Sequence, residues 1–343
     1  MEIKFQNYEL LLRHKFGISY HSRLSTPAVI IKLNQGEYEG YGEASLPPYL
    51  GETQDSVISF LNRIKLRDIT SFNDLIDLSK EINSVSINDY AAKASINIAM
   101  HDLYGKISNQ SCYALYGIEK SPLLFTSYTI GIDSPEMIIK KIEEAKSYKI
   151  LKIKLGTEND RKILELIREC TDKPLYVDAN QGWKDKYSAQ EFVNYLAENN
   201  VLLVEQPFPI NNYEDSAWLS ERSPLPIIAD ESIQTIRDID WAKNCFTGIN
   251  IKLMKCGGIT EAYKMIKKGR EANLKIMLGC MTESSCAISA AIQLSALVDY
   301  ADLDGNLLIL NDPFTCNTVK DGQLKLPDGN GLGIIPDKNK LTI

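Results

Sequence analysis

The 343-residue chain lacks the features that mark secreted, membrane-spanning and zinc-binding proteins. Its seven cysteines are odd in number and contain no C-x-x-C pair, which argues against a disulfide framework and a cysteine zinc site. No window approaches the roughly 18 uninterrupted apolar residues of a membrane span. Charges interrupt the N-terminal segment "MEIKFQNYELLLRHKF", so it does not resemble a secretory signal. We therefore expect a cytoplasmic protein with free thiols and no membrane partner.

Basic blocks and histidines are also scarce. The net charge of −7 is spread along the chain, and no Lys/Arg-rich run with interleaved aromatics occurs, so nucleic acid is not an expected partner. The three histidines, His14, His21 and His101, all precede residue 120, where a barrel-like pattern begins. An active site built on that barrel would need another residue type as its acid and base.

From about residue 120 onward, short apolar runs typical of strands alternate with amphipathic segments typical of helices. The expected strands are 123–130, 150–155, 174–179, 201–206, 226–231, 248–253, 274–279 and 297–304. Eight strands with seven intervening helices predict an α/β fold, a modified TIM barrel of the (β/α)₇β type, over residues 119–324.

Residues 1–118 have a different pattern, in which β-like stretches at 2–13 and 27–44 precede helical segments. They predict an α+β N-terminal capping domain, because barrel active sites open at the C-terminal strand ends, where a neighbouring domain can cover them. The turn-rich tail, about residues 325–343, is expected to return to this cap.

Two lysines interrupt the second expected barrel strand, "ILKIKL". Side chains alternate between the two faces of a strand, so Lys152 and Lys154 share one face and Ile153 lies on the other. The apolar residues must pack against the helices, which turns the lysines into the barrel. Taken alone, such a K-x-K pair is equally typical of a solvated strand end.

Each of the next three strands ends on a carboxylate, namely Asp178 in "YVDANQGW", Glu205 in "LLVEQPFP" and Asp230 in "IIADES". A single one would be interpreted as a helix cap or a loop ion pair, but three on consecutive strands should converge on one rim. Like charges this close repel unless a cation lies among them. Oxygen donors without cysteine or histidine favour one Mg²⁺ per site, with Mn²⁺ as a substitute.

Lys252 ends the sixth expected strand, on the same face as Asn250. Strands 2 and 6 lie roughly opposite each other in a barrel of eight, so Lys154 and Lys252 should approach a substrate from its two faces. One lysine would remove an α-proton beside a carboxylate bound to Mg²⁺, and the other would deliver a proton to the far face of the enolate.

Two neighbouring lysines have other expected roles. Lys152 should support Lys154 by lowering its pKa through like charge, and Lys255 lies beyond the strand end and is the less suitable reactive group. A Schiff-base lysine, as in barrel aldolases, is an alternative, but it leaves the three carboxylates unexplained.

The motifs "KIK", "DAN", "VEQP", "ADES" and "NIKLMKCGG" together resemble the muconate-lactonizing subgroup of the enolase superfamily, over essentially the whole chain. The resemblance implies that Lys154 and Lys252 form the acid/base pair and that the three carboxylates bind the metal. The subgroup contains cycloisomerases, o-succinylbenzoate synthases, N-acylamino acid racemases and dipeptide epimerases.

The motif "YADLDG" favours the last of these activities. It places Asp302 and Asp304 on one face of the final strand, similar to the D-x-D that binds the substrate ammonium in dipeptide epimerases. The alternative is that both are solvated or pair with the lysines.

We expect Mg²⁺-dependent epimerisation of the C-terminal residue of a small-molecule dipeptide such as L-Ala-D/L-Glu. The same subgroup's N-acylamino acid racemases and o-succinylbenzoate synthases are the alternatives, and a non-catalytic peptide-binding barrel is less favoured.

The resemblance also implies further substrate contacts. "KFGISYHSRLST" corresponds to a mobile cap loop, in which Arg23 would bind a glutamate side chain, although a surface arginine is an equal alternative. A second loop, "EASLPPYLGET", would form the other wall. Thr129, Met281 and Thr282 are similar in position to substrate-binding residues of dipeptide epimerases. The expected assembly is a homo-oligomer.

Overall fold

The computed structural model describes residues 1–18, 21–119 and 124–343. Its largest sheet contains eight parallel strands in sequence order. These are β4 (Ser127–Ile130), β5 (Ile150–Lys154), β6 (Leu175–Asp178), β7 (Val201–Glu205), β8 (Ile227–Ala229), β9 (Gly248–Lys252), β10 (Lys275–Gly279) and β11 (Tyr300–Asp302). An isolated parallel bridge between Thr126 and Ala301 connects the two ends of the sheet, so the barrel is nearly closed. The predicted (β/α)₇β barrel is confirmed.

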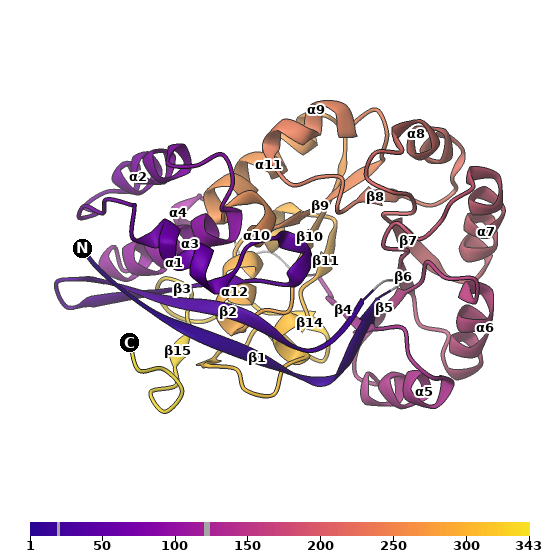
Figure 1. Ribbon diagram of the computed structural model, residues 1–343, viewed down its shortest axis with the longest axis horizontal. Coiled ribbons are helices and arrows are strands. Elements are labelled where there is room, and N and C mark those ends of the chain that lie inside the picture. Colours follow the sequence, from indigo (N-terminus) through magenta and orange to yellow (C-terminus); the bar gives the residue numbers. More distant parts are fainter. Residues whose placement is uncertain (19–20, 120–123) are drawn as a thin grey trace.

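Helices cover the outside of the barrel (Figure 1). The helices in this part of the chain are α5 (Pro135–Glu144), α6 (Asp160–Cys170), α7 (Lys186–Glu198), α8 (Tyr213–Arg222), α9 (Ile239–Ala242), α10 (Leu253–Cys256), α11 (Ile259–Glu271) and α12 (Ser285–Ile292), with the 3-10 turns η2 (Ile236–Asp238), η3 (Ser295–Leu297) and η4 (Gly305–Leu307). Inside, Tyr176, Leu203, Ile228 and Met277 form a separate buried cluster. Each lies two positions before a residue at the rim, so an apolar layer fills the barrel beneath the polar one.

The cap contains the antiparallel strands β1 (Glu2–Ile18), β2 (His21–Gln35) and β3 (Tyr38–Ser45). Its helices are η1 (Pro48–Leu50), α1 (Gln54–Leu61), α2 (Phe72–Ser84), α3 (Tyr90–Ile107) and α4 (Cys112–Leu115). A Cβ on Gly42 would lie 1.9 Å from the carbonyl oxygen of Ser95, so glycine is required where α3 packs on β3. The second predicted β stretch is two strands, because a turn at Gly36 (φ 61°) divides it.

The segment expected to be a cap loop is a hairpin in its described part. Gly17 pairs with Ser22, and residues 19 and 20 lie outside the described residues. Figure 1 shows the arm of β1 and β2 reaching from the cap to the barrel, where the Ile132 N–H donates to the Gly17 carbonyl at 3.2 Å. The cap therefore contacts the loop that follows the first barrel strand.

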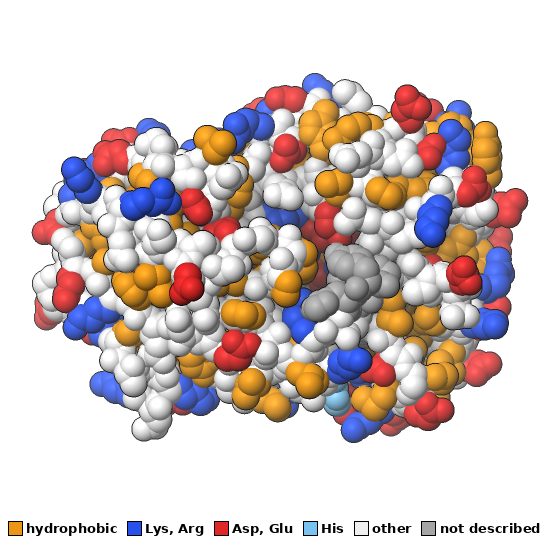
Figure 2. All heavy atoms as spheres, viewed as in Figure 1, with side chains coloured by type: hydrophobic (Ala, Val, Ile, Leu, Met, Phe, Trp, Pro, Cys, Tyr) orange, Lys and Arg blue, Asp and Glu red, His pale blue; other side chains and the backbone are white. Residues whose placement is uncertain are grey.

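The C-terminal segment forms two short antiparallel pairs, β12 (Phe314–Thr315) with β15 (Ile335–Pro336) and β13 (Val319–Lys320) with β14 (Gln323–Leu324). Beyond them, the Thr342 N–H donates to Gln6 Oε1 in β1 at 2.8 Å. Within the described ranges, no helix is both long and apolar enough to cross a membrane. Acidic and basic side chains are interspersed on the face shown in Figure 2.

Candidate active site

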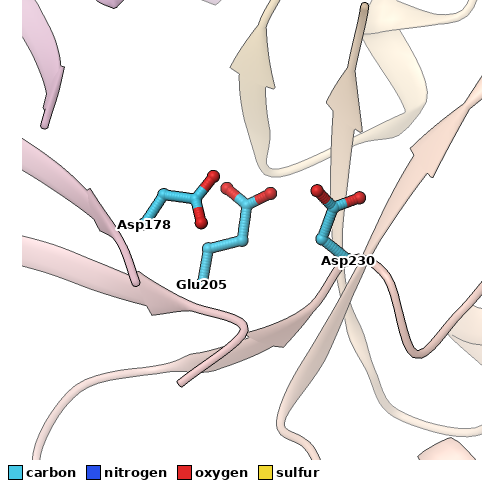
Figure 3. A group of neighbouring side chains, drawn as sticks. All are labelled: Asp178, Glu205 and Asp230. Atoms are coloured by element: carbon cyan, nitrogen blue, oxygen red, sulfur yellow. The ribbon is translucent and has the colours of Figure 1, made fainter. Parts of the chain in front are cut away.

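Strand register brings the predicted carboxylates to one level of the barrel. Lys154 is the register partner of Asp178, which in turn pairs with Glu205, and Asp230 directly follows β8. The three carboxylates turn toward one another (Figure 3), and one oxygen from each lies within 4.8 Å of the others. All three residues are buried. The polar rim expected from the alternation of the sequence is therefore one compact cluster.

This cluster fits a hard divalent cation. It offers only oxygen ligands, from three carboxylates that lie together, and Lys152 Nζ lies 2.7 Å from Glu205 Oε2. Burial and then repulsion from Asp178 raise the pKa of Glu205 to about 8, as expected where carboxylates are crowded together. Asp178, Glu205 and Asp230 are thus suited to hold Mg²⁺.

The two predicted reactive lysines lie on opposite sides of the barrel and line the same cavity, of about 240 Å³. Lys154 Nζ is 2.6 Å from Asp178 Oδ2, and Lys252 Nζ is 2.7 Å from Asp230 Oδ2. Both are more than nine-tenths buried. Although burial opposes it, the attraction of Asp230 raises the pKa of Lys252 well above its ordinary value. Each lysine is therefore held against a different end of the carboxylate cluster.

Lys152 has more acidic neighbours than the sequence suggested. Its Nζ lies 2.7 Å from Glu205, 2.7 Å from Asp302 and 3.1 Å from Asp178. Burial favours the neutral amine, but these carboxylates outweigh it and raise the pKa of Lys152 well above its usual range. Lys152 therefore links the carboxylate cluster to the last strand. Its predicted lowering of the pKa of Lys154 stays a prediction.

Two contacts around the carboxylates were missed by the sequence reasoning. Lys255 Nζ donates to Asp230 at Oδ1 (2.6 Å) and at the backbone carbonyl (2.7 Å), so it fixes that carboxylate. Asn250 Nδ2 donates to Glu205 Oε1 at 2.8 Å. A Cβ on Gly279 would lie 2.4 Å from Asn250 Oδ1, so the glycine makes room for this amide. The position of Asn250 on the face of Lys252 was the available signal.

The two aspartates of the last strand have different partners. Asp302 accepts hydrogen bonds from Lys152 Nζ at 2.7 Å and from Ser127 Oγ at 2.6 Å. Asp304 Oδ2 accepts the backbone N–H of Thr129 at 2.7 Å, and burial followed by repulsion from Asp302 raises the pKa of Asp304 to about 7. Pairing with a lysine, the alternative raised for this motif, is thus present at Asp302. Both aspartates and Thr129 line the cavity.

Cap residues form the opposite wall. Arg23, in β2, lines the cavity and donates through Nη2 to Thr282 Oγ1 at 3.0 Å and through Nε to Thr26 Oγ1 at 2.9 Å. Tyr49, from the second predicted loop, donates to Met281 Sδ at 2.6 Å. The structure therefore brings Arg23 to the cavity and into contact with Thr282, a barrel residue predicted to bind substrate.

Comparison with known proteins agrees with this architecture. Residues 4–117 match the mandelate racemase / muconate lactonizing enzyme N-terminal domain, and residues 138–340 match the enolase C-terminal domain-like family. The L-Ala-D/L-Glu epimerase of Bacteroides thetaiotaomicron is 46% identical, over 98% of this chain and 88% of that protein. The L-Ala-D/L-amino acid epimerase of Pedosphaera parvula is 36% identical, over 97% and 99%.

Solved structures show the same similarity. The dipeptide epimerase from Cytophaga hutchinsonii, complexed with Mg and the dipeptide D-Ala-L-Val, has a TM-score of 0.91 at 28% identity, over 99% of this chain and 96% of that one. The substrate-liganded L-Ala-D/L-Glu epimerase from Bacillus subtilis has a TM-score of 0.89 at 25% identity, over 98% of both chains. The similarity extends over the cap and the barrel together.

Proposed function

This chain belongs to the enolase superfamily, and on that premise we propose that it is an isomerase, a dipeptide epimerase. The observation that carries the proposal is the placement of Lys154 and Lys252. They lie on strands four apart in an eight-stranded barrel, each against a different carboxylate of one cluster. Relatives named as epimerases, aligned over nearly the whole chain, support it.

The proposed reaction is a proton transfer on one carbon atom. Asp178, Glu205 and Asp230 would hold Mg²⁺, which when bound would acidify the α-C–H by drawing charge onto the substrate carboxylate. A neutral lysine removes the α-proton from one face, and the second lysine, as an ammonium, donates a proton to the other face. The α-carbon of the C-terminal residue is thereby inverted.

The other end of the dipeptide would be recognised by its positive charge. Asp302 and Asp304 place carboxylates in the same cavity, where Asp302 is engaged by Lys152 and Ser127 and Asp304 accepts the backbone N–H of Thr129. An α-ammonium suits this site, whereas an N-acylated amino acid offers no cation there. This difference favours a dipeptide over the substrates of N-acylamino acid racemases and o-succinylbenzoate synthases.

An exchange experiment tests the proposal. Incubation of the protein with L-Ala-L-Glu in D₂O and Mg²⁺ should introduce one deuterium at the glutamate α-carbon, as read by mass spectrometry. Lys154→Ala should abolish the interconversion of stereoisomers while leaving the three carboxylates able to bind metal. No Mg²⁺-dependent deuterium incorporation, with this or any dipeptide of a library, would overturn the proposed function.

Arg23 is the proposed selector of an acidic second residue, because its guanidinium reaches the cavity wall. A charge-assisted hydrogen bond contributes about 1.5–3 kcal/mol, so Arg23→Met should lower kcat/KM for L-Ala-L-Glu by roughly 10- to 100-fold. The value for L-Ala-L-Met should change little. Equal losses for both dipeptides would argue against this role.

Three further expectations remain predictions: substitution of Mn²⁺ for Mg²⁺, a homo-oligomeric assembly and a cytoplasmic location.

A further inference from the structure

Several buried oxygen atoms at the rim of the barrel accept no hydrogen bond from any described residue, and two of them belong to side chains that contact each other. One is Oδ1 of Asn180, a residue 6% exposed that lies two positions after Asp178. The other is Oε2 of Glu231, the residue after Asp230. A buried acceptor without a donor costs about 1–3 kcal/mol. Two of them beside metal-ligand positions therefore indicate a donor that binds there.

The two side chains act as one unit. Asn180 Nδ2 donates to Glu231 Oε1 at 3.3 Å, and because a carboxylate oxygen accepts only from the NH₂ end, this contact fixes the orientation of the amide. The remaining oxygens, Asn180 Oδ1 and Glu231 Oε2, are the second polar atoms of the same two groups. Since β6 and β8 flank β7, the pair spans the strand that carries Glu205.

The backbone holds Asn180 in this place. Asn180 and Gln181 have left-handed φ angles of 41° and 66°, a conformation that asparagine tolerates better than most residues. The Asn180 N–H donates to Asp178 Oδ1 at 2.9 Å, and the Gln181 N–H donates to the carbonyl of Gln206 at 2.8 Å. Strained backbone of this kind persists where the surrounding contacts over-determine it, often at functional sites.

The chemistry of the donor follows from what the cavity contains. Lys154 and Lys252 line the same cavity, but each is already paired with a carboxylate. The proposed ammonium site is on β11, which is not adjacent to either β6 or β8. Mg²⁺ usually keeps several water ligands, and these polarised waters are strong hydrogen-bond donors.

We propose that Asn180 Oδ1 and Glu231 Oε2 accept hydrogen bonds from water coordinated to the metal, and so act as positioning residues that set the affinity of the metal site. The inference rests on the metal site of the proposed function and adds two residues that bind the ion only through its water. Partners of this kind typically contribute about 10- to 100-fold to metal affinity.

The test measures metal binding rather than turnover. Mn²⁺ is the probe, and its dissociation constant is obtained from the electron paramagnetic resonance signal of the free ion. The Glu231→Leu and Asn180→Gly variants should each bind Mn²⁺ roughly 10- to 100-fold more weakly. Glycine is chosen at position 180 because it tolerates the left-handed backbone. Glu231→Gln keeps one acceptor oxygen where the carboxylate has two, so it should recover only part of the loss. Glu221→Leu removes an exposed carboxylate of α8, 71% exposed, and controls for the change in net charge.

A second readout separates water binding from a merely structural role. ¹⁷O relaxation of water should show faster exchange of Mn²⁺-bound water in Glu231→Leu than in the wild type. Unchanged Mn²⁺ affinity and unchanged water exchange, with a raised KM for the dipeptide, would overturn the inference and assign the pair to substrate. A wild-type protein that binds no Mn²⁺ would instead overturn the metal site, and this inference with it.

Discussion

Asp302 and Asp304 are equivalent in the sequence pattern but differ in their contacts. Asp302 is engaged by Lys152 and Ser127, so part of its charge already balances a buried lysine. Asp304 accepts hydrogen bonds from Thr129, so its charge is the better match for the proposed substrate ammonium. At the scale of single residues, the pair therefore divides into a support for Lys152 and the proposed ammonium-binding group.

This division predicts different kinetic effects for the two amides. Asp304→Asn should raise KM for an Ala-Xaa dipeptide at least about tenfold with a smaller change in kcat, because the ammonium loses a buried counter-charge worth about 2–5 kcal/mol. Asp302→Asn should lower kcat as well, since it also releases Lys152. Steady-state polarimetry measures both values. An unchanged KM in Asp304→Asn would count against the ammonium role.

At the scale of elements, the packing of β9 against β10 controls the central carboxylate. The amide of Asn250 holds Glu205, and the missing side chain of Gly279 leaves space for that amide. The inward direction of Asn250 followed from the alternation of side chains. Its contact with Glu205 and the need for glycine could not, because they depend on the register between strands far apart in sequence.

Gly279→Ala should displace Asn250 and weaken metal binding. The added Cβ would lie 2.4 Å from Asn250 Oδ1, so the amide must move away from Glu205. Mn²⁺ affinity should fall about tenfold or more, as is usual when a group behind a metal ligand is lost. In the Gly279→Ala/Asn250→Ala double variant the clash is absent, so its loss should equal that of Asn250→Ala alone. Additive losses would contradict this coupling.

For the rest of the site too, the direction of a side chain could be predicted from sequence, whereas its contacts could not. The carboxylates and lysines were predictable because a period of two, on strands in sequential order, assigns each side chain a face and a level. The hairpin around Gly17 and the contacts of Lys152 with three carboxylates were not predictable in this way. Hydrogen-bond pairing extends the hairpin ladder, and the position of Lys152 among three carboxylates depends on side-chain packing across the barrel.

At the scale of the whole molecule, the cap and barrel share buried acidic groups. Glu43, in β3 of the cap, accepts hydrogen bonds from the N–H and hydroxyl of Ser284 in the barrel. Burial raises the pKa of Glu43 to about 7, and burial followed by repulsion from Glu43 raises the pKa of nearby Glu283 to about 8. The interface between the two parts therefore gains negative charge as pH rises through neutrality.

This charge predicts how stability changes with pH. Between about pH 4.5 and 8 the native state keeps protons that the unfolded chain has released from these two carboxyls, so their contribution lowers the free energy of unfolding as pH rises. Burial lowers the pKa of His101 from 6.5 to about 4, so His101 acts in the opposite direction, but its effect on stability is nearly complete at pH 6.5.

Metal-free protein should therefore unfold at lower urea concentration at pH 8.5 than at pH 6.5. Glu43→Gln and Glu283→Gln should each reduce that difference, by on the order of 1.4 kcal/mol per pKa unit removed. A pH dependence identical to that of the wild type in both variants would show that these carboxyls are already ionised at pH 6.5.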